Sequence, residues 1–312
     1  MPGALATLPF AWWNTKVAPP SIESKATKEH RNAATSVVRT LVEQKGCLVV
    51  ALAEVRRESI MSWLPDSRRA RWDVLADTSN DRHDFDVAIV FDRSALSLKN
   101  YLWARRFHAT QAVRAGLVAT FDFVDGSGPL VVIAAHWRTD AGNTKDAEDR
   151  RLSAAQELRD ALGATLQAEG KDVPVLILGD FNAEPFDRPF GAGLPTARSR
   201  AEVQRHRPRT ASDLLFYNAA WRWLGERDAW NAERKPPTLA GTYRLGSNTP
   251  TAWRTFDQVL VSPSLLRGTG WSLDESALEI YDGREVFDQA KARPRAPFDH
   301  LPIVGRLQRF EP

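Results

Sequence analysis

The sequence contains a single cysteine, Cys47, and no long hydrophobic run. One cysteine cannot form an intramolecular disulfide, and because Cys47 lies in the apolar stretch 47–53 we expect a buried thiol and no disulfide-linked partner. No stretch approaches the roughly 18 apolar residues of a membrane span, and the N-terminus lacks the charged and apolar segments of an export signal. We therefore expect a cytoplasmic protein without a membrane span.

A strong net charge is also absent. The formal net charge is +3 and the isoelectric point is about 9.1, a surplus too small to indicate a polyanionic partner by itself. Arginine greatly outnumbers lysine, which indicates either the base composition of the gene or a need for bidentate phosphate contacts, and we prefer the former. With 43% hydrophobic and 26% charged residues the composition is that of a globular protein, and we expect residues 1–312 to form one domain.

No internal repeat or low-complexity tract is present, and the apolar residues follow helix and strand periodicities in turn. Helical spacing covers 27–43 and 147–166, and Gly46 follows the first of these helices as a stop signal. The pattern predicts an α/β (α+β) four-layer sandwich, in which two packed mixed β-sheets are flanked by helices. Short apolar runs that predict the strands occupy 8–15, 47–55, 86–91, 117–123, 130–135, 173–178, 255–261 and 301–307.

Polar side chains stand at one end of most of these strands. In a packed sandwich the strand ends on one rim converge, so residues far apart in the sequence could line a single cleft. A single Asp or Asn after a strand is more often a turn former, and taken alone we interpret Asn14 and Asp257 in that way. The full set at strand ends comprises Asn14, Glu54, His136, Asp180 with Asn182, Asp257, and Asp299 with His300.

Two of these motifs carry a family resemblance. The run 176–182, Leu-Ile-Leu-Gly-Asp-Phe-Asn, and the run 298–302, Phe-Asp-His-Leu-Pro, resemble the signatures of the endonuclease/exonuclease/phosphatase superfamily, which includes deoxyribonuclease I and the abasic-site endonucleases. The resemblance covers nearly the whole chain and implies a deoxyribonuclease I-like fold. Supporting motifs follow in the family's order at 13–14, 53–54, 135–137, 241–243 and 256–259.

The resemblance implies a role for each polar residue at the predicted rim. Glu54 would bind Mg²⁺ or Mn²⁺ with help from Asn14 and Asp299, since hard cations prefer oxygen ligands. Asp180 would orient or deprotonate the attacking water, and Asn182 would hold that water or a phosphate oxygen.

The resemblance also implies partners for the two histidines. Asp299 would accept a hydrogen bond from His300 and favour its protonated form, and Asp257 could do likewise for His136. The second histidine makes the chain more similar to the deoxyribonuclease I and sphingomyelinase branches than to the abasic-site branch. The alternative for His136 is a hydrogen-bonded core histidine.

A segment rich in Pro, Gly and Arg follows the first signature, and a helix-like pattern over 211–224 follows it in turn, so we expect a loop and helix insertion at about 185–235. Its arginines could overhang the cleft and hold a nucleic-acid backbone, although a solvated loop remains the alternative. Trp221, Trp223 and Trp230 could stack on bases, but we prefer packing. The arginines are Arg198, Arg200, Arg205, Arg207 and Arg209.

Some other polar residues are expected to have no role in the site. Asp84 and Asp86 could form a metal pair, but we prefer turn and strand-start chemistry for both. We expect the remaining histidines to lie on the surface, and these are His30, His83, His108 and His206.

The residues and the resemblance together predict a divalent-metal-dependent phosphodiester hydrolase that uses Mg²⁺ or Mn²⁺. The preferred substrate is nucleic acid, DNA or RNA, cleaved by metal-assisted attack of water. One alternative is a phosphatase or phosphodiesterase acting on a small or lipid-derived phosphoester, because one fold hosts many substrates. A second alternative is a catalytically silent module that binds nucleic acid or another partner.

Overall fold

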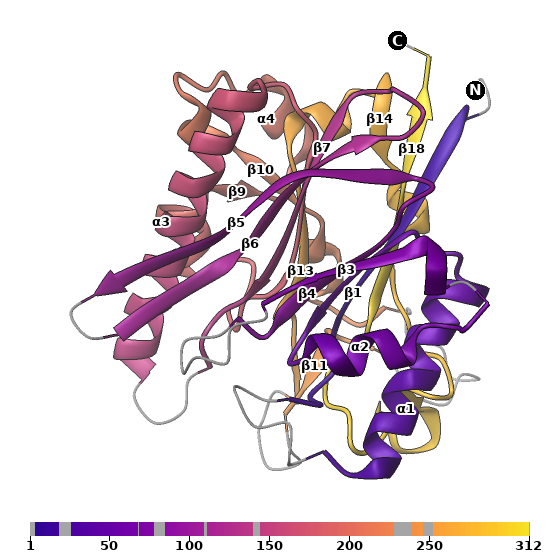
Figure 1. Cartoon of the computed structure of the whole chain (residues 1–312). Helices are drawn as coiled ribbons and strands as arrows, with labels where there is room; N and C mark the ends of the chain where they lie inside the picture. Colours follow the sequence, from indigo (N-terminus) through magenta and orange to yellow (C-terminus); the bar gives the residue numbers. More distant parts are fainter. Residues whose placement is uncertain are drawn as a thin grey trace.

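A computed structural model describes residues 4–18, 26–67, 69–77, 85–108, 111–139, 144–227, 239–245 and 252–311. Two β-sheets pack face to face, and helices cover their outer surfaces (Figure 1). The first sheet has the order β14 (Gly270–Leu273), β18 (Ile303–Phe310), β1 (Ala6–Asn14), β2 (Val49–Ala53), β4 (Val87–Asp92) and β3 (Trp72–Ala76), with β15 (Glu279–Ile280) also beside β18. The second sheet has the order β5 (Leu96–His108), β6 (Gln111–Phe123), β7 (Pro129–His136), β8 (Val175–Asp180), β13 (Asp257–Val261), β10 (Phe216–Asn218) and β9 (Thr196–Ala197).

Three hydrophobic layers hold the sandwich together. Side chains such as Phe10, Phe121 and Leu178 fill the space between the sheets, where alternate residues of both inner faces meet. A second layer lies between the first sheet and the helices α1 (Lys28–Arg39), which continues as a π-helix over Thr40–Gln44, and α2 (Arg57–Trp63). A third lies between the second sheet and α3 (Thr144–Glu169). The predicted four-layer sandwich is confirmed.

Helix α1 shows how local chemistry sets an element. The Thr27 side chain accepts a hydrogen bond from the backbone N–H of His30 and so caps the first turn. Ala34, Val37 and Val38 are buried because they share the face that packs on the sheet. Cys47 is buried in the same hydrophobic layer, as expected. Burial raises the pKa of its thiol to about 12. None of the described helices is long and apolar enough to cross a membrane.

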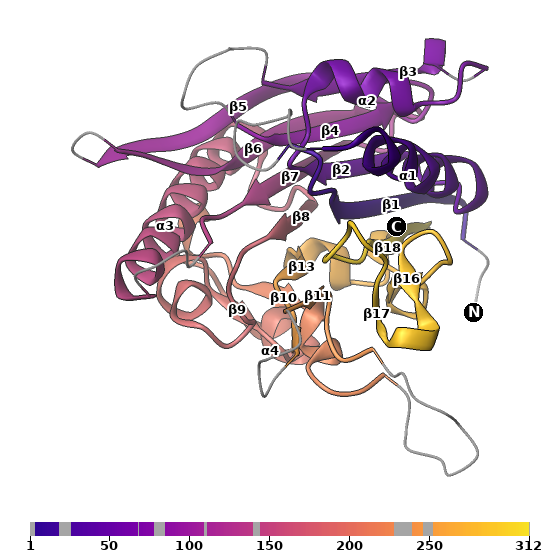
Figure 2. The same ribbon diagram turned by 90° about the horizontal axis from the view of Figure 1, so that it is seen from below.

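Strand direction brings the polar strand ends to one edge. Strands β1 and β2 are parallel, with Asn14 level with Ala53, and β7 and β8 are parallel, with His136 level with Asp180. Strand β13 is antiparallel to β8, so its first residue, Asp257, lies opposite Asp180. This edge is the lower one in Figure 1, and Figure 2 views the molecule from that side.

The segment expected to form an inserted loop and helix adds strands to the second sheet in the part that the structure describes, 185–227. In place of the helix expected over 211–224 there are β10 and short 3₁₀ turns at Ala211–Asp213 and Ala219–Trp223. Tertiary pairing overrides the helical spacing, because β10 pairs with β13 and Asn218 donates a hydrogen bond to the buried Gln258 at 2.7 Å. The segment also holds a short helix, α4 (Arg200–Arg205).

Strands β3, β5 and β14 were not predicted. The alternation in β5 is interrupted by register shifts between Leu98 and Asn100 and between Ala104 and Arg105. A β-bulge inserts a residue and changes the face on which later side chains lie, so a period-two pattern does not extend through it. The remaining described strands form two short hairpins, β11 (Tyr243–Arg244) with β12 (Trp253–Arg254) and β16 (Phe287–Asp288) with β17 (Arg293–Pro294).

Candidate active site

Asn14 joins the two sheets at the polar edge. It ends β1, and its side-chain Nδ2 donates to Glu54 Oε1 at 3.1 Å and to Asp180 Oδ2 at 2.9 Å. All three side chains are buried, so each of these polar contacts replaces water that the fold has removed. Asn14 does form the expected turn, because its Oδ1 accepts a hydrogen bond from the backbone N–H of Lys16 at 3.1 Å. Its Nδ2 also bridges two carboxylates from different sheets, which the turn interpretation did not predict.

The backbone is unusual at three positions of this edge. The φ angles are 56° at Lys16, 54° at Glu54 and 47° at Asn182. These lie in the left-handed region that residues other than glycine seldom adopt. Such conformations cost free energy and cluster where the surrounding structure holds a functional side chain in place. At Asn182 the turn is fixed by its backbone N–H, which donates to Asp180 Oδ1 at 3.0 Å, and by its Nδ2, which donates to the carbonyl oxygen of Trp137 at 2.9 Å.

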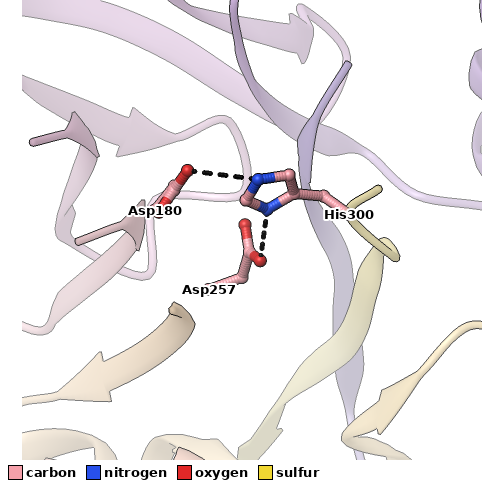
Figure 3. A group of neighbouring side chains, drawn as sticks. All are labelled: Asp180, Asp257 and His300. Carbon is pink, nitrogen blue, oxygen red and sulfur yellow. Dashed lines mark hydrogen bonds and ion pairs between the residues drawn. The ribbon is translucent and has the colours of Figure 1, made fainter. Parts of the chain in front are cut away.

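His300 lies between two carboxylates (Figure 3). Its Nδ1 is 2.7 Å from Asp257 Oδ2, and its Nε2 is 3.6 Å from Asp180 Oδ2. The second oxygen of Asp257 accepts a hydrogen bond from Trp12 Nε1 at 2.8 Å. The prediction that Asp299 orients His300 is wrong, because Asp257 occupies that place from the antiparallel strand β13.

His136 also lies between carboxylates. Its Nδ1 is 2.9 Å from Asp86 Oδ2, and its Nε2 is 3.7 Å from Asp180 Oδ2 and 3.9 Å from Glu54 Oε1. The predicted pairing of His136 with Asp257 is therefore wrong. Asp86 stands directly before β4, as its strand-start interpretation predicted, but the expectation that it has no role in the site is wrong. Asp84, which was considered together with Asp86 as a possible metal pair, lies outside the described residues.

A sequence signal for Asp86 existed. It immediately precedes β4, which is antiparallel to β2, with Val87 opposite Ala53. An antiparallel neighbour begins at the edge where β2 ends, so a carboxylate before β4 reaches the same edge as Glu54.

The two histidines are held in their charged form. Burial alone would lower the pKa of His136, but the charge and hydrogen bond of Asp86, with the charge of Asp180, raise it to about 9. Burial likewise opposes protonation of His300, and the carboxylates of Asp257 and Asp180 raise its pKa to about 10. Both rings are therefore imidazolium ions at neutral pH, each presenting an Nε2–H toward Asp180.

Burial acts on the carboxylates as well. It raises the pKa of Glu54, against the charge of His136, and it raises the pKa of Asp257, against the charge and hydrogen bond of His300. Burial also opposes ionisation of Asp86, but the charge and hydrogen bond of His136 dominate and lower its pKa. Asp257 accepts hydrogen bonds from two donors, so the Asp257–His300 pair is held as carboxylate and imidazolium.

Asp299 has a different partner. It forms an ion pair with Lys16 at the exposed side of the site, while its Oδ1 is buried and has no hydrogen-bond partner. Tyr243 forms an isolated β-bridge with His300, and their rings lie 4.5 Å apart. Burial and the nearby charge of Asp299 raise the pKa of Tyr243 to about 12, so its hydroxyl stays protonated. Lys16 was not expected at the site, because it does not end a strand of the predicted pattern. Tyr243 belongs to the supporting motif 241–243, but no role in the site was predicted for it.

Two buried carboxylate oxygens fit a hard cation. Glu54 Oε2 and Asp299 Oδ1 are buried without a hydrogen-bond partner, and a divalent cation would satisfy such oxygens. Ligand atoms of Asp180, Asp257 and His300 also lie within 4.8 Å of one another. That second group fits a cation less well, because Nδ1 of His300 is bonded to Asp257 and a protonated imidazole cannot act as a ligand.

The arginine-rich segment lies at the opposite end of the second sheet. Arg200 of α4 pairs with Glu275 and donates to the carbonyl oxygen of Leu266, which follows the far end of β13. Figure 1 shows α4 at the upper edge, away from the site. The expectation that the arginines overhang the cleft is therefore wrong for Arg200 and Arg205, which lie on α4, and for Arg207 and Arg209, which follow it. Arg198 precedes α4, and its guanidinium lies 5.5 Å from the Trp221 ring.

The structure meets some of the expectations for the tryptophans and the remaining histidines and not others. Trp223 packs against the hydrophobic layers, as preferred, while Trp221 lies 5.5 Å beneath the guanidinium of Arg198. His30 is buried rather than exposed, with Nε2 3.0 Å from the carbonyl oxygen of Thr15. His206 is half-buried near the Asp213 carbonyl oxygen. The structure does not describe Trp230, His83 or the side chain of His108.

The fold is shared with several solved structures. Mannosyl-6-phosphatase from Bacteroides thetaiotaomicron has a TM-score of 0.61 at 15% identity, with 96% of this chain and 99% of that one covered. TDP2 from D. rerio, complexed with single-strand DNA product, has a TM-score of 0.60 at 15% identity over 97% and 99%. The human Nocturnin catalytic domain with bound sulfate has a TM-score of 0.57 at 16% identity over 98% and 96%. A search of curated proteins gave no match.

A family comparison gives the assignment. Residues 20–231, more than half of the chain, match the model of the Endonuclease/Exonuclease/phosphatase family, whose members are phosphoester hydrolases. The matched span contains Glu54, Asp86, His136, Asp180 and Asn182. The motif order, the two-sheet fold and this match agree, and the chain belongs to the endonuclease/exonuclease/phosphatase family.

Proposed function

We propose that this protein is a divalent-metal-dependent phosphodiester hydrolase that cleaves nucleic acid. The observation that carries the proposal is the position of Asp180, whose Oδ2 lies 3.6 and 3.7 Å from the Nε2 atoms of two protonated histidines. Two imidazolium donors facing one space suit a phosphoryl group, which develops negative charge and needs a proton on its leaving oxygen.

In this scheme each residue has a separate task. Asp180 accepts a hydrogen bond from the attacking water and aligns it with phosphorus. His136 and His300 donate hydrogen bonds to the phosphoryl oxygens, and one of them protonates the leaving oxygen. Asp86 and Asp257 act as positioning residues, because each fixes Nδ1 of one ring and so aims its Nε2–H at the substrate.

Glu54 and Asp299, with Asn14 beside them, would hold the cation. Bound Mg²⁺ or Mn²⁺ supplies charge neutralisation of the phosphoryl oxygens and a water of lowered pKa. Lys16 holds one oxygen of Asp299 and leaves the other without a hydrogen-bond partner. Asn182 would contact the same water or a phosphate oxygen, and its turn is fixed by hydrogen bonds to Asp180 and Trp137.

A second candidate is hydrolysis of a small phosphoester. It is favoured by the likeness to the mannosyl-6-phosphatase, which matches this chain about as well as the DNA-bound structure does. The same acid, amide and imidazole groups serve either substrate, so the distinction depends on what surrounds the site.

The test compares wild-type protein with Asp180→Asn, which keeps the side-chain shape and removes the charge. Both are incubated with supercoiled plasmid, linear duplex, single-stranded DNA and RNA, each with Mg²⁺, Mn²⁺ or EDTA. Metal-dependent cleavage by wild type alone is expected. Release of phosphate from sugar or inositol phosphates with no cleavage of any nucleic acid would instead establish the second candidate.

A further inference from the structure

Arg244 is joined to the site through the backbone of the polar edge. It belongs to β11, which lies at the lower edge of the molecule in Figure 1. Its backbone N–H donates to the carbonyl oxygen of Asp299 at 3.0 Å, and the preceding residue, Tyr243, forms an antiparallel bridge with His300. In an antiparallel pair the residue after Tyr243 lies opposite the residue before His300, so Arg244 and Asp299 are cross-strand neighbours.

This pairing decides which side chains share a face. Successive side chains alternate between the two faces of paired strands, and cross-strand neighbours lie on the same face. The rings of Tyr243 and His300 lie 4.5 Å apart on one face. Arg244 and Asp299 therefore share the other face, where Trp253 of β12 is the cross-strand neighbour of Arg244 on its far side. The Arg244 side chain thus lies beside the carboxylate that is proposed to hold the cation.

The Arg244 side chain has no partner within the part of the chain that the structure describes. It is half-buried, its Nε is buried without an acceptor, and its guanidinium forms no ion pair or cation–π contact with a described residue. The charge of Asp299 is already matched, because that carboxylate forms an ion pair with Lys16. A guanidinium N–H that has lost water and gained no acceptor costs free energy. Folding therefore does not account for Arg244.

The chemistry of this side chain fits a phosphate group. A guanidinium is a planar fork of N–H donors that matches two oxygens of one phosphate, and it carries its charge at every working pH. The phosphoryl group that reacts faces the Nε2–H groups of His136 and His300 in the proposed mechanism. Because Arg244 lies on the face of the pair away from the His300 ring, its acceptor is a separate group beyond Asp299.

We propose that Arg244 binds a second phosphate group of the substrate, next to the phosphate that reacts. This inference rests on the proposed function and adds a substrate class, a phosphoester that carries two phosphates. In a nucleic-acid strand the second group is the phosphate of the adjoining nucleotide, which is the source favoured by the proposed function. A bisphosphorylated sugar presents the same chemistry, and the test separates the two sources.

The test compares binding of thymidine 3′,5′-bisphosphate with binding of the two thymidine monophosphates by calorimetry. Full-length Asp180→Asn protein with Mg²⁺ is the parent, so that no ligand is hydrolysed. The parent should bind the bisphosphate at least about tenfold more tightly than either monophosphate, and adding Arg244→Gln should reduce this preference to about twofold or less. Adding Arg205→Gln instead, which removes an exposed arginine from α4, should leave the preference of the parent in place.

A second readout separates substrate binding from a structural role. Because Arg244 has no partner to lose, Arg244→Gln should have a Tm in EDTA at or above that of wild type, and the Mg²⁺-dependent rise of Tm should persist. Arg244→Lys keeps the charge without the planar fork, so it should retain part of the preference for the bisphosphate. A lower Tm or a lost Mg²⁺ effect in Arg244→Gln would assign Arg244 to the fold or to the cation site and overturn the inference.

The remaining outcomes separate this inference from the nuclease proposal. Equal loss of affinity for mono- and bisphosphates in Arg244→Gln would place Arg244 at the reacting phosphate and overturn the inference, as would an absent or unchanged preference. A preference that depends on Arg244 for fructose 1,6-bisphosphate alone would support the second phosphate and identify a sugar as its source. A thymidine bisphosphate preference that depends on Arg244, without cleavage of nucleic acid by wild type, would support the inference and remove the nuclease function.

Discussion

The carboxylate of Asp180 faces two imidazole rings, and each ring is held from behind by another carboxylate. This symmetry means that the charge of Asp86 and of Asp257, rather than burial, decides the protonation of His136 and His300, since burial alone would favour neutral rings. The chemistry at the residue scale therefore depends on two side chains that do not themselves face the substrate.

Replacing Asp86 should move the pH dependence of activity. In Asp86→Asn the charge that raises the pKa of His136 to about 9 is lost, so the ring loses its proton at lower pH. The alkaline limb of the kcat profile should shift to lower pH, with kcat at pH 8 reduced at least about tenfold and KM little changed. The exposed Asp73→Asn is the control, and an unshifted alkaline limb in Asp86→Asn would show that His136 does not act as a proton donor.

Metal binding can be followed by stability. Because a ligand that binds only the native state stabilises it, Mg²⁺ at about 100 times its Kd should stabilise wild type by about 2.7 kcal/mol. Glu54→Gln replaces the buried Oε2 by a neutral amide nitrogen, so the Mg²⁺-dependent rise of Tm should largely disappear. The exposed Glu43→Gln should retain it. A full Mg²⁺ effect in Glu54→Gln would place the cation elsewhere.

At the scale of elements, strand β8 has to approach its neighbours closely just before it delivers Asp180. Gly179 is opposite Ala135 of β7 and Gln258 of β13, and a Cβ on it would lie 2.8 Å from the Ala135 carbonyl oxygen and 2.8 Å from the Phe181 ring. The glycine of this motif is therefore needed for packing of the strand rather than for contact with substrate.

Gly179→Ala should destabilise the protein by about 1–3 kcal/mol, since the backbone of β7 cannot move without disturbing the sheet. Gly191→Ala is the matched control, because nothing lies within 4 Å of its added Cβ, and it should change stability by less than about 0.5 kcal/mol. Urea unfolding measures both. Equal unfolding midpoints for the two variants would contradict the close approach at Gly179.

At the scale of the whole molecule, the hydrogen bonds and ion pairs of the site connect the two sheets. Asn14 with Asp180, Trp12 with Asp257, and the two carboxylate–imidazole pairs each join a residue of one sheet to a residue of the other. Buried charge pairs of this kind stabilise the fold only while both partners keep their charge.

Raising the pH should therefore lower the Tm. The pKa values of His136 and His300 are raised to about 9 and about 10 in the folded protein, against about 6.5 in an unfolded chain. Their stabilisation is full below the unfolded value and is lost as the pH rises through 9 to 10. Tm is measured in EDTA on Cys47→Ala, because ionisation of Cys47 on unfolding has the same sign. A Tm that is constant from pH 7 to 10 would contradict the raised pKa values.

The sequence by itself determined most of the central strands of both sheets, the outer helices α1 and α3, and the identity of most groups at the polar edge. Strand periodicity locates Asn14, Glu54, Asp180 and His300, because a strand that ends in a polar residue is a local pattern. The family also follows from local motifs that are contiguous in sequence. The run around Asp180 lies within the residues 20–231 that match the family model, and the run around His300 follows that span.

Only the tertiary structure decided which carboxylate holds which histidine. Asp86 and His136 come from different sheets, as do Asp257 and His300, and their pairing depends on how the two sheets are aligned across the interior. The placement of α4 at the far edge has the same origin. Sequence periodicity specifies which face of a strand is buried, whereas the packing of sheet on sheet fixes which strand ends meet.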